Sequence, residues 1–296
     1  MIEKKTAGSV VFSIFNYILL AVVGFVCLYP FWYVVMASFS NPNAFLRHNF
    51  IMLFKPAGFS LEGYKSVFTT NVAIGYRNTI FYVLAGTSIS MVMTCMAAYV
   101  LSQKGYMFKK HLTVMIMFTM YFNGGLIPFY LWVQQLGMID TVWSILIPTA
   151  VSTYNVIVLR TAFAAVPDSL IEAARLDGAN DAKILVKVMI PLSRATISVI
   201  ILFYAVSRWN EWLPATMFLR SRTLYPLQLF LREILLTSTS QSLVSNTSGL
   251  DATNATALAE IIKYATIVVS TLPVLMIYPF IQKYFVAGMM IGGVKE

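Results

Sequence analysis

Residues 10–37 form a run of 28 residues without a charged side chain, VVFSIFNYILLAVVGFVCLYPFWYVVMA. About 20 predominantly apolar residues are enough for one helix to cross a bilayer. The apolar centre of a secretory signal peptide is shorter, about 7–15 residues. The run therefore predicts a first membrane-spanning helix rather than a signal peptide.

Composition extends this prediction to the whole chain. Of its 296 residues, 58% are hydrophobic and 11% are charged, and the mean hydropathy is +0.75. About a quarter of the residues of a soluble domain are charged, so most of this chain is unsuited to water. We expect an all-α polytopic membrane protein that forms one domain over residues 1–296. Six spans are expected, at 13–38, 78–101, 112–134, 141–162, 195–219 and 264–285.

The distribution of basic residues predicts how these spans are oriented. Lysines and arginines gather before the first span, between spans two and three, and in the segment 163–194. Short loops rich in Lys and Arg stay on the cytoplasmic side of a membrane. We therefore expect both termini and the segment 163–194 in the cytoplasm, and the long loops 39–77 and 220–263 outside. The net charge of +9 is explained in this way, and no nucleic-acid partner is expected.

The segment 163–194 is the largest polar interruption of the apolar chain. Ser169 and Glu172 match a capping box near Pro167, and Gly178 suits the left-handed residue that ends a helix. Asn180 or Asp181 can cap a second helix that runs to Ile190, before Pro191 bends the chain. From the pattern alone, the segment is either an amphipathic connector on the membrane surface or a short helix that fits a groove on a cytoplasmic partner.

The sequence EAARLDGANDAKILVKVMIPL (172–192) resembles the EAA motif in the permease subunits of bacterial ABC importers. The order Ile-Pro-Leu at its end departs from the commoner Leu-Pro. The segments 122–148, 207–235 and 272–296 resemble carbohydrate-importer permeases of the maltose-importer second-subunit type, in the branch for complex or polymeric sugars. The residues that match the motif are Glu172, Ala173, Ala174, Gly178, Ile190, Pro191 and Leu192.

The resemblance implies six transmembrane helices in a bacterial inner membrane, with a cytoplasmic coupling helix between helices four and five. It also implies a second homologous permease subunit, two ATPase subunits, an extracytoplasmic solute-binding protein and an oligosaccharide substrate. The tail GGVKE (292–296) resembles the family's short C-terminal segment, which contacts the ATPase. The residues expected to couple the chain to an ATPase are Glu172, Ala173, Ala174, Arg175, Asp177 and Gly178.

A phosphate-binding loop of the form G-x-x-x-x-G-K-[ST] is missing from the sequence. We therefore expect ATP and Mg²⁺ to bind to the partner ATPase. No cofactor, metal ligand or catalytic residue is expected on this chain.

Span five carries a polar group in an apolar setting, Arg208, Trp209, Asn210, Glu211 and Trp212. Arg208 and Glu211 are three residues apart and suited to an internal ion pair. Alternatively, the group contacts a sugar, with Arg208 favouring an acidic, uronate-type sugar because guanidinium matches a carboxylate. Further candidates for the substrate pathway are Tyr121, Asn123, Tyr154 and Asn155. Polar residues in membrane helices also bond neighbouring helices.

Other functions have less support in the sequence. An ion-coupled secondary transporter generally needs titratable groups within the membrane, and Glu211 is the one acid clearly inside a span. A membrane enzyme lacks a plausible active site, because His48 and His111 lie in loops and carboxylates do not cluster. Within ABC importers, a permease for a non-sugar solute is the remaining alternative, because such permeases share the coupling motif.

Overall fold

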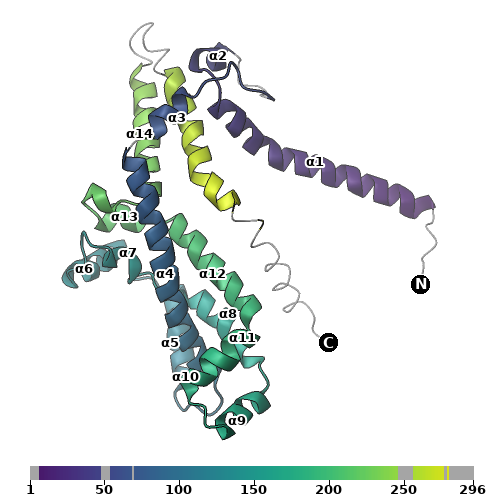
Figure 1. Cartoon of the computed structure of the whole chain (residues 1–296), viewed down its shortest axis with the longest axis vertical. Coiled ribbons are helices and arrows are strands. Elements are labelled where there is room, and N and C mark those ends of the chain that lie inside the picture. The colour runs from purple at the N-terminus through teal and green to yellow at the C-terminus, as the bar shows by residue number, and fades with distance from the viewer. Residues whose placement is uncertain (1–6, 48–53, 69, 246–255, 277–278, 280–296) are drawn as a thin grey trace. The chain divides into compact units, whose positions relative to one another are not determined.

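The computed structural model of the chain describes residues 7–47, 54–68, 70–245, 256–276 and 279. They fall into two compact units, one from Met1–Thr69 with Leu231–Leu272 and the other from Thr70–Phe230 with Pro273–Glu296. Helices dominate both units (Figure 1). In the described ranges, extended pairing is limited to one bridge between Ser40 and Phe59. The prediction of an all-α chain is confirmed.

Three of the described helices are long and apolar enough to cross a membrane: α1 (Ala7–Ser38), α4 (Thr70–Ser102) and the helix Thr256–Met276. The chain is therefore polytopic, as expected. Two of these helices begin before the predicted start of their span. Helix α4 begins at Thr70 instead of residue 78, and the last helix begins at Thr256 instead of residue 264. Apolar content locates a span's centre, whereas polar end turns extend a helix beyond it. The predicted end of span six, at 285, lies outside the described residues.

The first unit contains α1, the short helices α2 (Pro42–Arg47) and α3 (Glu62–Val67), the helical residues 231–245, and the helix that begins at Thr256 as far as Leu272. Its core joins Ala37 of α1, Phe45 of α2, Ala57 and Ile261. The prediction of 39–77 as a plain loop was wrong in detail, because it holds α2, α3 and the first turns of α4. Both short helices pack apolar residues that a loop would have left in solvent.

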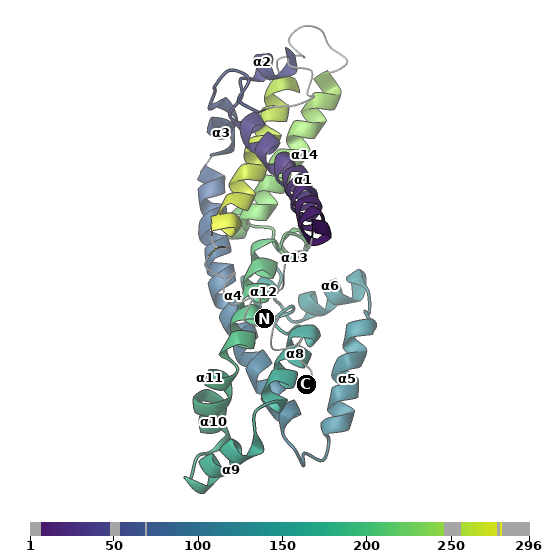
Figure 2. The same ribbon diagram turned by 90° about the vertical axis from the view of Figure 1, so that its right-hand side faces the viewer.

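The second unit is built around α4, α8 (Thr153–Ala164) and α12 (Arg194–Trp209), which pack side by side (Figures 1 and 2). A buried cluster of apolar residues fills the space between them. The Tyr204 hydroxyl also links the three helices by hydrogen bonds. It lies 2.7 Å from the Thr94 hydroxyl, and it accepts a hydrogen bond from the Ser152 N–H at 3.0 Å. The buried cluster comprises Cys95, Ala98, Tyr99, Leu159, Phe163, Ile171, Ile184, Met189, Ile197, Ile200 and Tyr204.

Span three, predicted as one helix over 112–134, is two helices. Helix α5 (Lys109–Tyr121) and α6 (Leu126–Gln135) meet at 117°, and Figure 2 shows the bend. The residues between them explain the break. Gly125 has a φ of +94°, which glycine alone adopts at no steric cost, and Asn123 Oδ1 accepts the Gly125 N–H at 2.9 Å. By length and composition, α5 and α6 are together either a broken span or a re-entrant loop.

Span four, predicted as one helix over 141–162, is also interrupted. It consists of α7 (Trp143–Leu146), an irregular stretch at 147–152, and α8. Pro148 lies in the irregular stretch. Its ring lacks an N–H and clashes with the preceding turn, so the helix stops before it. The last carbonyl groups of α7 are consequently left without helical partners.

Span five, predicted over 195–219, ends early for the same reason. Helix α12 stops at Trp209, and Pro214 lies in the first turn of α13 (Leu213–Phe218). The region after it, predicted as the loop 220–263, contains η2 (Arg222–Leu224) and α14 (Leu227–Ser245). That loop prediction was wrong up to Ser245, because Leu227, Leu229 and Phe230 give α14 a buried apolar start.

The side chain of Asp140, in the turn after α6, forms hydrogen bonds with the turn after α13. Its backbone has a positive φ of +57°, and its carboxylate accepts the N–H groups of Arg220 at 2.9 Å and Ser221 at 2.8 Å. The Ser221 hydroxyl donates to the same carboxylate at 2.5 Å. These hydrogen bonds stabilise the charged carboxylate and hold the pKa of Asp140 below its ordinary value. The Ser221 hydroxyl has the largest effect, followed by the two N–H groups.

Candidate functional site

The polar segment 163–194 begins with α9 (Asp168–Leu176), at the lower end of the second unit in Figure 1. Gly178 ends α9 in the left-handed conformation with a φ of +75°, as predicted. Ala179 N–H donates to Ala174 O and Gly178 N–H donates to Arg175 O, both at 3.0 Å, which is the Schellman pattern. The predicted capping box was wrong. Pro167 is the N-cap without a side-chain bond, because the helix already begins at Asp168 and puts Ser169 inside its first turn.

A second helical stretch follows, from Asp181 to Leu192. Asn180 caps it as predicted, with its Oδ1 accepting the Lys183 N–H at 2.9 Å. The stretch passes from α10 (Asp181–Ile184) through a π-helical turn (Leu185–Met189) into α11 (Ile190–Leu192). Pro191 explains the π turn, because it removes one backbone donor and widens the preceding turn. The chain then bends by 91° into α12, so the predicted bend near Pro191 is confirmed.

Helix α9 has one buried residue and one exposed apolar face. Ile171 packs into the core of the second unit. Leu176 is 89% exposed and Leu170 is 44% exposed, and among the predicted coupling residues Glu172 and Ala173 are also exposed. Two exposed leucines and the exposed Glu172 and Ala173 therefore leave this side of α9 uncovered by the described part of the chain. Leu170 and Leu176 were not among the predicted coupling residues, and the sequence reasoning did not foresee that they are exposed.

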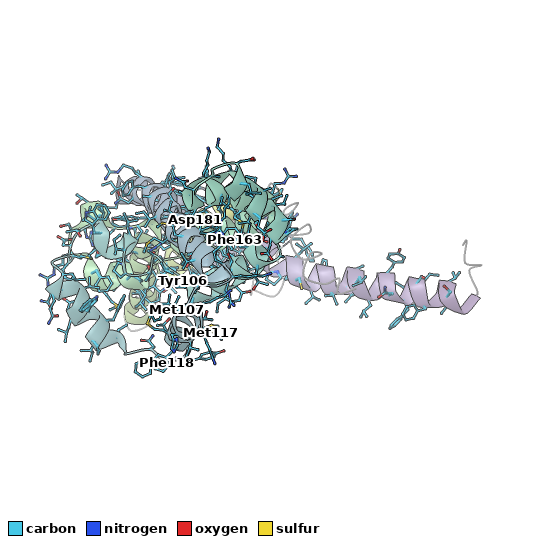
Figure 3. The ribbon with its side chains drawn as sticks, turned by 90° about the horizontal axis from the view of Figure 1, so that it is seen from below. Tyr106, Met107, Met117, Phe118, Phe163 and Asp181 are labelled. Carbon is cyan, nitrogen blue, oxygen red and sulfur yellow. The ribbon has the colours of Figure 1, made fainter. Side chains whose placement is uncertain are left out.

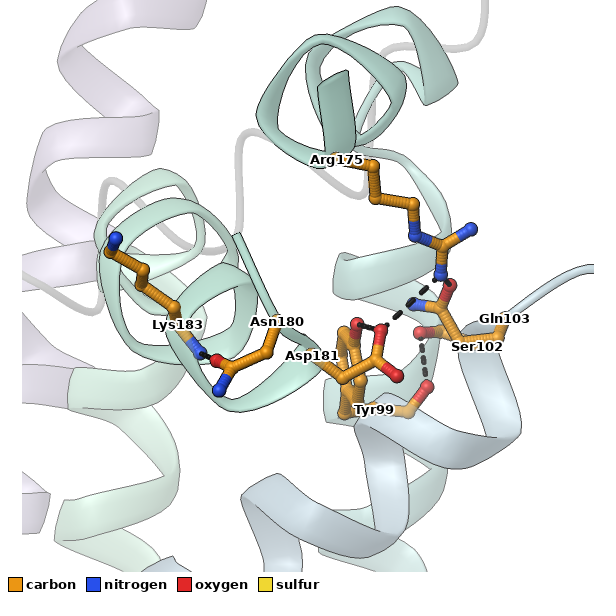
Figure 4. Close-up of polar contacts among 7 residues, drawn as sticks. All are labelled: Tyr99, Ser102, Gln103, Arg175, Asn180, Asp181 and Lys183. Carbon is orange, nitrogen blue, oxygen red and sulfur yellow. Dashed lines mark hydrogen bonds and ion pairs between the residues drawn. The ribbon is translucent and has the colours of Figure 1, made fainter. Parts of the chain in front are cut away.

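A cluster of polar contacts fixes α9 and α10 to the end of α4 (Figure 4). The Tyr99 hydroxyl donates to Asp181 Oδ1 at 2.9 Å, and Arg175 Nη2 donates to the same oxygen at 3.3 Å and to Gln103 Oε1 at 3.4 Å. Figure 3 views this end of the unit, with Asp181 labelled. Arg175, a predicted coupling residue, thus contacts its own chain.

An exposed ion pair adds to this attachment. Lys104, just after α4, pairs with Asp168 at the start of α9. The hydrogen bond to the Asp168 carboxylate raises the pKa of Lys104 above its ordinary value. The end of α4 is therefore connected to both α9 and α10. These contacts attach α9 and α10 to a helix that is long and apolar enough to span a membrane.

A second candidate site is a cavity of about 360 Å³ in the second unit. It opens where the irregular stretch 147–152 meets the end of α12. Four of the nine residues predicted for the substrate pathway line it, namely Tyr154, Asn155, Arg208 and Glu211. The other lining residues are Thr149, Ser152, Phe203, Tyr204 and Ser207.

Arg208 is 4% exposed and held by its own chain. Its Nη1 lies 2.6 Å from Ile145 O, 2.8 Å from Thr149 Oγ1 and 2.9 Å from Glu211 Oε2, and its Nη2 donates to Leu146 O at 3.2 Å. Two of these acceptors are the carbonyl groups left unpaired where α7 stops. Arg208 therefore caps the broken helix and forms an ion pair with Glu211. Of the two roles that the sequence left open for Arg208, the structure shows the internal ion pair.

The remaining predicted pathway residues do not line this cavity. Tyr121 is exposed at the end of α5, and Asn123 caps the turn before α6. Trp209 packs against Tyr76, with ring centroids 6.2 Å apart, and Asn210 donates to Val206 O at 2.9 Å. Trp212 is the residue before α13. In the described ranges, no group of three His, Cys, Asp or Glu side chains is placed to hold a metal ion.

The family of binding-protein-dependent transport system inner membrane components matches residues 88–291. The chain belongs to this family. It is therefore the membrane-embedded permease subunit of an ABC importer, and the resemblance seen in the EAA sequence is confirmed. Permeases of this family work with a solute-binding protein and an ATPase.

Similar proteins match the chain over nearly its full length. The polygalacturonan/rhamnogalacturonan transport system permease protein YtcP of Bacillus subtilis (strain 168) is 36% identical over 287 residues, 96% of this chain and 98% of that protein. Protein LplC of the same organism is 34% identical over 292 residues, 98% and 97% of the two chains. In a crystal structure of a bacterial ABC transporter involved in the import of the acidic polysaccharide alginate, one chain matches with a TM-score of 0.81 and 33% identity. The match covers 95% of this chain and 99% of that one.

Proposed function

We propose that this permease imports oligosaccharides that contain uronate units. The observation that carries the proposal is the agreement of two similar proteins on acidic polymers. One, 36% identical, is named for polygalacturonan and rhamnogalacturonan, and the other, 33% identical with a TM-score of 0.81, is involved in alginate import. Galacturonan and alginate both consist of sugars that carry a carboxylate. A cavity that is lined by polar side chains together with the rings of Tyr154 and Phe203 suits a sugar.

The proposed complex contains this chain, a second homologous permease, two ATPase subunits and an extracytoplasmic binding protein. ATP and Mg²⁺ bind to the ATPase subunits, which alone hydrolyse ATP, and both termini of this chain lie in the cytoplasm. Helix α9 docks on one ATPase subunit. What supports this docking is its exposed surface of Leu170, Glu172, Ala173 and Leu176, together with its attachment to α4.

Uptake by cells with and without this chain tests the substrate class. Cells that express it are expected to take up labelled trigalacturonate at least tenfold faster than cells in which its gene is deleted, while uptake of an unrelated amino acid stays equal. Purification of the tagged chain in mild detergent is expected to recover a second permease and an ATPase. Equal trigalacturonate uptake with and without the gene would contradict the uronate proposal, and a chain that purifies alone would contradict the complex.

Substitution of Asp181 tests the path from α9 to α4. Asp181→Ala removes the shared acceptor of Tyr99 and Arg175 and leaves the Lys104–Asp168 and Arg175–Gln103 contacts, so a movement of α9 is expected to be passed to α4 less completely. Because the Arg175–Asp181 ion pair is exposed, it contributes less than about 1 kcal/mol to the free energy of unfolding. The fold of the variant is therefore expected to persist. The number of sugars imported per ATP hydrolysed in proteoliposomes is expected to fall about two- to fivefold.

Lys183→Ala is the matched control for Asp181. Lys183 belongs to the same short helix, and its backbone N–H, rather than its side chain, makes the cap contact with Asn180. The control is expected to keep the wild-type ratio of transport to hydrolysis. Tyr99→Phe, which removes a single hydroxyl, is expected to change the ratio in the same direction as Asp181→Ala. An unchanged ratio in both Asp181→Ala and Tyr99→Phe would show that α4 does not receive the movement of α9.

A further inference from the structure

The cavity of the second unit lies at the start of a helix. Helix α8 runs for 12 residues from Thr153, and Ser152, Tyr154 and Asn155 from its first turn line the cavity. Irregular backbone at membrane depth persists only where protein covers it or where it borders an aqueous cavity. The irregular stretch 147–152 meets this condition, and it turns the positive end of α8 towards the cavity.

The backbone donors at this end are only partly used inside the chain. Ser152 caps α8, with its Oγ accepting the Asn155 N–H at a long 3.5 Å, and Val156 N–H donates to Ser152 O at 3.0 Å. The N–H groups of Thr153 and Tyr154 come before the first intrahelical bond, so the helix itself offers them no acceptor. Donors of this kind, combined with the helix dipole, attract anions.

A second observation points to a ligand independently of the helix end. Asn155 is 4% exposed and its side chain lines the cavity. Among the residues that the structure describes, none forms a hydrogen bond with its carboxamide. Buried amides are paired in nearly all proteins, and an unpaired one needs an explanation. Because its side chain borders the cavity, the amide is available to a polar ligand there.

The charged residues that line the cavity do not repel an anion at the start of α8. Glu211 is the acid among the lining residues, and both of its oxygens are occupied, Oε1 by the Thr149 hydroxyl at 3.2 Å and Oε2 by Arg208 at 2.9 Å. Arg208 in turn neutralises Glu211 and caps α7. The pair therefore adds no net charge, and the remaining attraction for an anion comes from the start of α8.

We propose that the start of α8 binds the carboxylate of a uronate unit, with the Asn155 amide as a donor. The rings of Tyr154 and Phe203, with centroids 6.4 Å apart, border the same cavity and offer apolar faces to the sugar's C–H groups. This inference rests on the proposed function, because it names where the acidic substrate is held. It assigns recognition of the carboxylate to α8 instead of to Arg208, the residue favoured by the sequence.

The test compares two probes in proteoliposomes of the complete importer, trigalacturonate and its fully methyl-esterified form, which keeps the sugar rings but carries uncharged methyl esters in place of the carboxylates. Asn155→Asp keeps the shape of the side chain and places a negative charge where the carboxylate binds. It is expected to raise the KM for trigalacturonate at least tenfold and to change the KM for the ester less than threefold. Asn155→Ala is expected to give a smaller loss with the same preference, because it removes the donor without adding repulsion.

Asn43→Asp is the matched control, since it makes the same chemical change at an exposed residue of α2. It is expected to leave both KM values unchanged. Equal losses for the two probes in Asn155→Asp, or no loss for either, would overturn the carboxylate site and leave the proposed function standing. If wild-type importer transports neither probe, the proposed function fails, and the carboxylate site fails with it. Thermal unfolding of each variant complex shows whether a loss comes from misfolding.

Discussion

Gly178→Leu is expected to lower ATP hydrolysis stimulated by the loaded binding protein more than tenfold, with the membrane helices still folded. Gly178 has a φ of +75°, and a non-glycine residue there costs about 1–2 kcal/mol. Apart from Gly178 and its two neighbours in sequence, no atom of the described chain lies within 4 Å of where its Cβ would be. The leucine side chain therefore projects away from the protein's own core, beside the exposed face of α9, where we expect it to block the proposed docking of an ATPase subunit.

Gly137→Leu is the matched control for this prediction. Gly137 also follows a helix end, has a φ of +68° and has open space around its Cβ position, but it lies after α6. It is expected to keep stimulated hydrolysis within about twofold of wild type. Gly178→Ala, with the same backbone cost and a small side chain, is expected to fall between the two. The docking proposal fails if Gly178→Leu keeps wild-type stimulation and still co-purifies with the ATPase.

The end of α9 and the start of α10 were predictable because their causes are local. A left-handed backbone at Gly178 and a side-chain cap at Asn180 depend on a few neighbouring residues, and both are present. The capping box failed because Pro167 and Asp168 compete for the same first turn, and a pattern of residue types does not reveal which residue begins the helix. The cluster of Tyr99, Arg175 and Asp181 was not foreseen, since Tyr99 is 82 residues from its acceptor.

The interrupted spans show why hydropathy alone misled. Residues 112–134 and 141–162 are apolar enough for continuous helices. Hydropathy does not indicate at which residue a backbone hydrogen bond of the helix is lost. The two breaks lie at Gly125 and Pro148, residue types that favour an interruption of a helix. The partners that stabilise the breaks lie far along the chain, as Arg208 does for the carbonyl groups of α7. The sequence therefore indicated polar residues in span five but left their role open between a sugar contact and an internal pair.

Arg208→Ala is expected to destabilise the second unit by about 3–5 kcal/mol, the usual cost of removing one partner of a buried ion pair. The loss leaves Glu211 without its cation and the carbonyl groups of Ile145 and Leu146 without donors. Thermal unfolding of the purified importer measures this effect. Because the cavity wall itself is lost, uptake of trigalacturonate and of its methyl ester is expected to fall together.

Two further variants separate this structural role from direct contact with substrate. Arg194→Ala removes the same residue type from the exposed start of α12 and is expected to leave the unfolding temperature within about 2 °C of wild type. Arg208→Met combined with Glu211→Gln removes both charges, and buried pairs replaced in this way often lose little stability. The double variant is expected to recover part of the stability, but not all, because methionine cannot donate to the carbonyl groups of α7. A normal unfolding temperature in Arg208→Ala, with loss of trigalacturonate uptake alone, would instead make Arg208 the substrate's carboxylate ligand.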